Sequence, residues 1–143
     1  MISGVPQGSV IGPLLFVMFI NDMPYEIKSN ICKLFVDDCK IYGDVSKADN
    51  NTLQTDLTAL ETWSKIWQLP FNVTKCKVMR FGYHNQRTDY ELYNQVLEDT
   101  SVEKDLGIMV DNKLNFHAHA SAASKKANQI LGVIEKAYKS RDQ

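Results

Sequence analysis

Two adjacent aspartates interrupt a segment that otherwise favours a β-strand. The segment CKLFVDDCKIYG runs from Cys32 to Gly43, and Asp37 and Asp38 lie at its centre. Aspartate is disfavoured in strands, and burying an ionised carboxylate near a core costs on the order of several kcal/mol unless it is compensated. The pattern therefore predicts two short strands, residues 31–36 and 39–42, that form a tight hairpin turning at the aspartates.

Length and composition fit one globular domain. The 143 residues are 44% hydrophobic and 23% charged, so the chain is long enough to bury a core. Its three cysteines are odd in number and lack zinc-site spacing, which argues against a disulfide scaffold and is typical of an intracellular compartment, cytoplasm or nucleus. The apolar run at residues 13–20 is far shorter than the roughly 20 residues of a membrane span, so we expect a buried helix and no membrane partner.

Charge alone gives little reason to expect nucleic acid as a partner. The formal net charge is −1. Residues 1–70 carry 5 basic and 8 acidic residues, a net −3, whereas residues 71–143 carry 11 basic and 9 acidic residues, a net +2. A solvated surface is the simpler explanation of a difference of this size.

The other segments alternate between helical and strand patterns. Helices are predicted for residues 13–22, 53–67 and 115–138. Strands are predicted for residues 76–82 and 105–111, and a hairpin that turns near Asn94 and Gln95 for residues 90–98. A loop rich in glycine and proline precedes the first helix. This order predicts an α+β fold with helices packed on an antiparallel sheet.

Together these segments resemble the reverse transcriptase domain of non-LTR (LINE-type, jockey-like) retrotransposons. Five motifs carry the resemblance in that family's order: GVPQGSVIGPLLF, FVDD, FNVTKCKVMRFG, EKDLGIMVDNKLNF and the final helix. The resemblance spans nearly the whole chain. It implies a partial polymerase palm over residues 1–114, with the Asp-Asp hairpin packed against helices, and the start of a helical thumb over residues 115–143.

The resemblance implies that the aspartate pair catalyses two-metal phosphoryl transfer. In such a site carboxylates hold two Mg²⁺ ions, of which one activates the primer 3′-hydroxyl and the other stabilises the departing pyrophosphate. Asp37 and Asp38 are accordingly the predicted catalytic residues and metal ligands. An Asp-Asp pair can also be a plain solvent-exposed turn, but the surrounding motifs favour the catalytic interpretation.

Three further residues are implied to contact nucleotide or template. Gln7 and Gly8 lie in the loop that, in this family, packs beside the templating base and the incoming nucleotide. Phe35 stands at an aromatic position beneath the catalytic turn. The alternatives are a glycine-rich helix entry without a ligand for the loop and plain core packing for Phe35.

The resemblance extends to the pyrophosphate and the primer. Lys75 corresponds to a lysine that protonates or steadies the pyrophosphate, although Cys76 replaces the usual threonine after it and a solvated lysine is the alternative. Leu106 and Gly107 correspond to the primer grip, where close backbone packing matters more than side-chain chemistry. Basic residues of the final helix either contact template–primer phosphates or form a solvated face: Lys125, Lys126, Lys136, Lys139 and Arg141.

The family's first catalytic aspartate lies upstream of the glycine-rich loop, and this sequence begins at Met1 with Ser3 and Gly4 already inside that loop. We therefore expect a fragment of an RNA-directed DNA polymerase that is inactive alone and whose bare strand edge makes it poorly soluble. In the complete domain it would use an RNA template, a DNA primer, dNTP and two Mg²⁺ ions, and the missing N-terminal part is a candidate partner. The alternatives are a non-catalytic remnant that binds nucleic acid or protein at most, and an unrelated α+β interaction domain.

Overall fold

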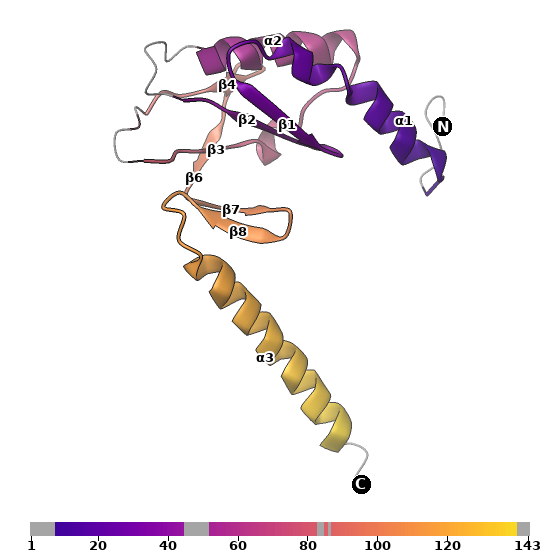
Figure 1. Ribbon diagram of the computed structural model, residues 1–143, viewed down its shortest axis with the longest axis vertical. Coiled ribbons are helices and arrows are strands. Elements are labelled where there is room, and N and C mark those ends of the chain that lie inside the picture. The colour runs from indigo at the N-terminus through magenta and orange to yellow at the C-terminus, as the bar shows by residue number, and fades with distance from the viewer. Residues whose placement is uncertain (1–7, 45–51, 83–84, 86, 140–143) are drawn as a thin grey trace. The chain divides into compact units, whose positions relative to one another are not determined.

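The computed structural model describes residues 8–44, 52–82, 85 and 87–139, which form two compact units. Unit 1 comprises residues 1–76 and 86–98, and unit 2 comprises residues 77–85 and 99–143. Three helices and several short strands confirm a mixed α+β fold (Figure 1). Among the described residues the strands pair into four separate two-stranded sheets rather than the expected larger sheet. The functional boundary predicted at residue 114 stays a prediction.

Unit 1 contains the aspartate hairpin and the helices that support it. Its elements in chain order are α1 (Ile11–Ile20), the 3-10 helix η1 (Met23–Glu26), β1 (Ile31–Phe35), β2 (Asp38–Tyr42), α2 (Thr52–Ile66), the 3-10 helix η2 (Val73–Lys75), β4 (Glu91–Leu92) and β5 (Gln95–Val96). The first two predicted helices are present, with α1 beginning before Pro13, which a first helical turn tolerates. The expectation that α1 is buried is wrong, because Ile20 is its one buried residue in this structure. No helix in the described part of the chain is both long and apolar enough to cross a bilayer.

The core of unit 1 lies between α1, η1, α2 and the hairpin. Its buried residues are Ile20, Met23, Ile27, Leu60 and Trp63. Leu60 and Trp63 belong to the apolar stripe that predicted α2, so the helical periodicity located the core face of this helix correctly. One face of the hairpin packs against the same cluster through alternate residues of both strands: Cys32, Leu34, Cys39 and Ile41.

Two predicted turns are each displaced by one residue toward the N-terminus. The aspartate hairpin turns at Val36 and Asp37, and the second hairpin turns at Tyr93 and Asn94 rather than near Gln95. Tyr93 and Asn94 both have positive φ angles, 52° and 58°, as a type I′ turn requires. The sequence lacks the usual glycine at this turn, which explains the error in its position.

Unit 2 contains β3 (Lys77–Met79), β7 (Val102–Asp105), β8 (Ile108–Asp111) and α3 (His117–Lys139). It also contains most of β6 (Glu98–Thr100), whose first residue belongs to unit 1. The prediction of a single strand over residues 105–111 is wrong, because Leu106 and Gly107 form the turn of the β7–β8 hairpin. β3 pairs with β6. The guanidinium of Arg80 reinforces this pair by donating from Nε to both carboxylate oxygens of Asp99 at 3.1 Å.

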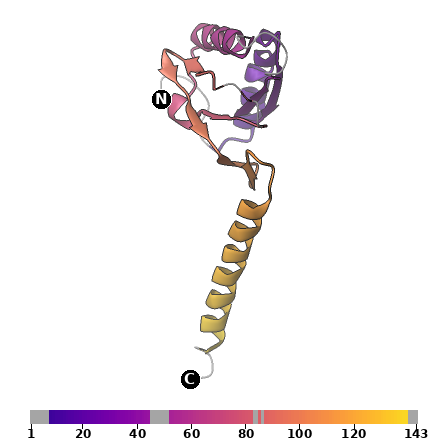
Figure 2. The ribbon, with the colours of Figure 1, turned by 90° about the vertical axis from the view of Figure 1, so that its left-hand side faces the viewer.

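The helix α3 confirms the predicted C-terminal helix. Its first turn contacts β8, where His119 Nδ1 accepts a hydrogen bond from the Met109 amide at 3.4 Å. Beyond its first turn, α3 continues away from the β7–β8 hairpin of the same unit as a straight rod (Figure 2). Its apolar stripe is exposed rather than packed in this structure, with Ile130, Leu131 and Ile134 between 45% and 54% exposed.

Candidate functional site

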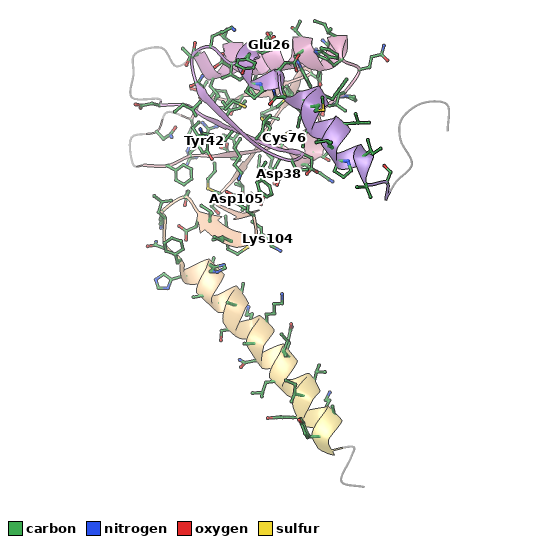
Figure 3. The ribbon with its side chains drawn as sticks, turned by 45° about the vertical axis from the view of Figure 1, so that its right-hand side comes forward. Glu26, Asp38, Tyr42, Cys76, Lys104 and Asp105 are labelled. Carbon is green, nitrogen blue, oxygen red and sulfur yellow. The ribbon has the colours of Figure 1, made fainter. Side chains whose placement is uncertain are left out.

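The aspartate hairpin presents both carboxylates at one end. Five residue pairs form its ladder, and the last joins Phe35 to Asp38, which leaves Val36 and Asp37 as a two-residue turn. Asp37 therefore occupies the tip, and Asp38 begins β2. Figure 3 shows Asp38 at the turn end of this strand and Tyr42 at its other end. Both aspartates are exposed.

The turn itself is strained. Val36 has a φ angle of 54°, in the left-handed region that β-branched residues avoid. Of the two turn residues only Val36 has a positive φ angle, a conformation that glycine adopts most readily. A valine held in this conformation costs roughly 1–2 kcal/mol. Such strain is often found where a site fixes the direction of its side chains.

The two faces of the hairpin have different surroundings. The inward face contacts the core, as described above, and holds the strands in place. The outward face carries Phe35 beside Asp38, Lys33 opposite Lys40, and Ile31 opposite Tyr42. Phe35, Ile31 and Tyr42 are 52% to 59% exposed. The hairpin is thus a supported projection with an exposed, partly apolar face next to its carboxylates.

A buried carboxylate on α2 anchors the open end of the hairpin. Asp56 is 1% exposed, and its oxygens accept hydrogen bonds from the backbone amides of residues 28, 29 and 30 at 3.1, 3.3 and 3.0 Å. It also accepts one from the Asn30 side-chain amide at 2.9 Å. These donors immediately precede β1, so Asp56 fixes the position from which the hairpin starts. Four donors compensate the desolvation of the charge.

Asn30 extends this anchor to the end of β2. A Cβ atom added to Gly43 would lie 2.9 Å from Asn30 Oδ1, closer than real contacts allow. Glycine at position 43 therefore lets the Asn30 side chain lie against the backbone that leaves β2. Asp56 therefore holds the chain at the start of β1, and Asn30 lies close to the chain that leaves β2, at the end of the hairpin opposite the aspartates.

Sequence reasoning did not single out Asp56. The residue stands within the apolar stripe of α2, between Leu53 and Leu57, where an aspartate would ordinarily interrupt the buried face. Its presence on a face that the periodicity assigns to the core was the available signal. A buried acidic residue needs donors, but their location 26 to 28 residues earlier cannot be derived from the helix pattern.

Of the two loop residues assigned to nucleotide or template, the structure places one. Gln7 lies outside the described residues. Gly8 has a φ angle of +86°, and an added Cβ would meet no atom within 4 Å. The positive φ angle therefore explains why residue 8 is a glycine. At the following entry to α1, Ser9 Oγ accepts a hydrogen bond from the Gly12 amide at 3.0 Å. A role in binding stays a prediction.

Phe35 is not part of the core. It is 57% exposed and lies on the outward face, directly opposite Asp38 in the ladder. The plain-core alternative therefore does not describe it. Its position beside the carboxylates leaves its ring accessible to a ligand at the turn, and the binding role assigned by resemblance stays a prediction.

Lys75 ends η2 and is exposed. The turn before it is held by Asn72, whose Oδ1 accepts from the backbone amide and the hydroxyl of Thr74 at 3.2 and 2.7 Å. Cys76 donates its thiol to the Asn72 carbonyl oxygen at 3.3 Å, a bond that a hydroxyl can also make. A threonine at position 76 could make the same bond through its hydroxyl, and the role of Lys75 stays a prediction.

Leu106 and Gly107 belong to unit 2, where they form the β7–β8 turn with φ angles of 46° and 90°. An added Cβ at Gly107 would meet no atom within 4 Å, so the expected close backbone packing does not explain this glycine. The left-handed turn conformation explains it instead. Contact with a primer stays a prediction for both residues.

The carboxylate pair fits part of a Mg²⁺ site. Mg²⁺ is usually bound by one or two protein carboxylates together with water and substrate phosphates. Asp37 and Asp38 offer two exposed carboxylates on adjacent residues of a supported turn. In the ranges that the structure describes, no group of three or more His, Cys, Asp and Glu side chains comes together to hold a metal. Further ligands would have to come from substrate or from another segment.

Comparison with known proteins gives a consistent result. The family model described as reverse transcriptase (RNA-dependent DNA polymerase) matches residues 2–134. The chain is 31% identical over 142 residues to the probable RNA-directed DNA polymerase from transposon BS of Drosophila melanogaster, covering 90% of this chain and 16% of the relative. It is 29% identical over 127 residues to the RNA-directed DNA polymerase from mobile element jockey of the same organism, covering 82% of this chain and 14% of the relative. The chain thus spans about a sixth of the length of these relatives. No solved structure matches.

Proposed function

Because the chain belongs to the reverse transcriptase (RNA-dependent DNA polymerase) family, we propose that it forms the catalytic hairpin region of an RNA-directed DNA polymerase from a jockey-like non-LTR retrotransposon. Its relatives are named as polymerases of a transposon and of mobile element jockey, so the resemblance to this family is confirmed. In this proposal unit 1 forms part of the polymerase palm and α3 begins the thumb.

One observation carries the proposal: a core-supported hairpin holds Asp37 and Asp38 together at an exposed turn. A carboxylate pair that served only solubility would need neither a strained valine beside it nor a buried anchor behind it. A two-metal site does need rigid support, because small displacements of the metals reduce catalysis strongly. The family places phosphoryl transfer at such a pair.

In this function the aspartates hold Mg²⁺ and orient it toward the substrates. The bound ions would supply activation of the primer hydroxyl and neutralisation of charge on the leaving group. Asp56 and Asn30 position the hairpin, and Phe35 supports the nucleotide side of the turn. Gln7 and Gly8 would lie beside the template and nucleotide, Lys75 would stabilise pyrophosphate, and Leu106 and Gly107 would contact the primer.

Two adjacent carboxylates offer a small part of the ligands that two Mg²⁺ ions need. We therefore propose that the chain does not extend primers alone and that further segments of a polymerase complete its site. A chimaera tests this. Residues 8–134 would replace the matching segment of the jockey polymerase, and primer extension on an RNA template would be measured with Mg²⁺.

The proposal predicts incorporation by the chimaera that is lost in its Asp37→Ala variant and retained in the matched surface variant Asp89→Ala, whose carboxylate is exposed on another segment of unit 1. Removal of a metal ligand should reduce the rate by roughly a thousandfold or more. Equal incorporation by the Asp37→Ala and unaltered chimaeras would contradict it.

A non-catalytic binding role is the second candidate. The exposed apolar residues of α1 favour it, because Ile11, Leu14 and Met18 are 61% to 68% exposed. A folded chimaera that does not extend primers would support this second function over the first.

A further inference from the structure

Two cysteines lie in contact on the inward face of the hairpin. Cys32 pairs with Ile41 and Cys39 pairs with Leu34, so the two thiols are diagonal neighbours across the ladder. Their sulfur atoms are 3.6 Å apart. Both residues are half-buried where they pack beside the core. The third cysteine, Cys76, makes a separate hydrogen bond to Asn72.

The contact makes the two thiols chemically different. A hydrogen bond from the Cys39 thiol stabilises the thiolate of Cys32 and lowers the pKa of Cys32, and the charge of Lys33 adds to this effect despite partial burial. Because the thiolate is the reactive form, Cys32 is the nucleophile of the pair.

We propose that Cys32 and Cys39 form a reactive dithiol site whose substrates are small-molecule disulfides such as glutathione disulfide. The Cys32 thiolate attacks one sulfur of the glutathione disulfide, which forms a mixed disulfide and releases one glutathione thiolate. Cys39 then loses its proton to solvent and attacks the Cys32 sulfur, which releases the second glutathione. The two cysteines are oxidised to one disulfide while glutathione disulfide is reduced to two thiols.

The second step needs only a small local movement, because the two sulfur atoms are already in contact at 3.6 Å. The sulfur atoms must approach by about 1.5 Å to reach the disulfide bond length of about 2.05 Å. Among the described residues β1 and β2 pair only with each other, and a two-stranded hairpin can make such a local adjustment more easily than the centre of a large sheet.

The site lies directly behind the proposed catalytic turn. A disulfide between residues 32 and 39 would link the two strands around Phe35, Val36 and both aspartates. Oxidation would therefore fix the hairpin through a bond that reducing conditions reverse. This inference depends on the thiol contact and not on the proposed polymerase activity, so either can fail without the other.

The test uses the whole reduced chain, fused to a cysteine-free solubility partner. Glutathione disulfide is added in limiting amount at neutral pH, the reaction is stopped with acid at intervals, and peptides are identified by mass spectrometry. We expect Cys32 to be modified first, at least roughly threefold faster than Cys76, followed by an internal 32–39 disulfide that retains no glutathione. Dithiothreitol should reverse it.

Variants separate the two steps. Cys39→Ser should stop at a stable glutathione adduct on Cys32, Cys32→Ser should lose the fast reaction, and the matched control Cys76→Ser should behave as the unaltered chain. In concentrated guanidinium chloride the three cysteines should react at similar rates. Fastest modification of Cys76 in the folded chain, or a disulfide that joins Cys76 to either partner, would overturn the proposal without reliance on any variant.

Discussion

Replacing Asp56 with alanine should destabilise unit 1 substantially. The substitution removes the acceptor of four hydrogen bonds from residues 28–30. At a net value of about 1 kcal/mol each, these bonds contribute about 4 kcal/mol. Residues 28 and 29 are exposed, so water can solvate part of the released donors, and we expect a loss of about 3 kcal/mol in the free energy of unfolding.

Urea unfolding followed by tryptophan fluorescence measures this loss, because Trp63 lies in the core of the same unit and is 3% exposed. Asp56→Asn keeps one acceptor oxygen but turns an amide donor toward other donors. Its free energy of unfolding should therefore fall by about 2 kcal/mol. The matched control Asp89→Asn changes an exposed aspartate and should stay within about 0.5 kcal/mol of the unaltered chain. If Asp56→Ala also stayed within that range, the anchor would have no energetic role.

Three further predictions concern the same unit. Gly43→Ala should lower the free energy of unfolding by roughly 1–2 kcal/mol, because its Cβ would lie 2.9 Å from Asn30 Oδ1; urea unfolding checks it, and an unchanged midpoint would contradict the close contact. Val36→Gly should raise the same free energy by about 1 kcal/mol by removing left-handed strain, and calorimetry showing a lower melting temperature would refute that strain. The hydrogen bond from Lys65 lowers the pKa of Glu61, so Glu61 stabilises the fold above its unfolded pKa near 4.5, and this stabilisation is lost as pH falls through the lowered folded value. Unfolding curves of Glu61→Gln between neutral pH and pH of about 3 should lack this acid-dependent component, and an unchanged pH profile would contradict it.

Local sequence signals predicted the elements whose cause is local. The hairpin followed from strand-forming residues on both sides of an aspartate pair, and α2 followed from apolar residues at helical spacing. The turn positions were less accurate, because residues such as Val36, Tyr93 and Leu106 adopt left-handed conformations that their types do not favour. Without glycine or asparagine at the first turn position, sequence alone gives no marker of where the chain reverses.

Features that depend on distant residues could not be predicted in the same way. The burial of Asp56 depends on donors near residue 30, and the thiol contact depends on the register of two strands. The exposed face of α3 shows the opposite case, since its periodicity predicted an apolar stripe but could not say what that stripe contacts. Of the candidate site, the pattern FVDD located the carboxylate pair, and the structure supplied its support.

The most direct measurement is the location of divalent metal binding by nuclear magnetic resonance. Mn²⁺ would replace Mg²⁺ as a paramagnetic probe that broadens amide signals near its ligands. We expect selective broadening of residues 35–39 that disappears in the double variant Asp37→Asn and Asp38→Asn and persists in Asp89→Asn. Broadening that is unchanged in the double variant, or that is absent from the hairpin, would contradict the claim that this turn exists to bind metal ions.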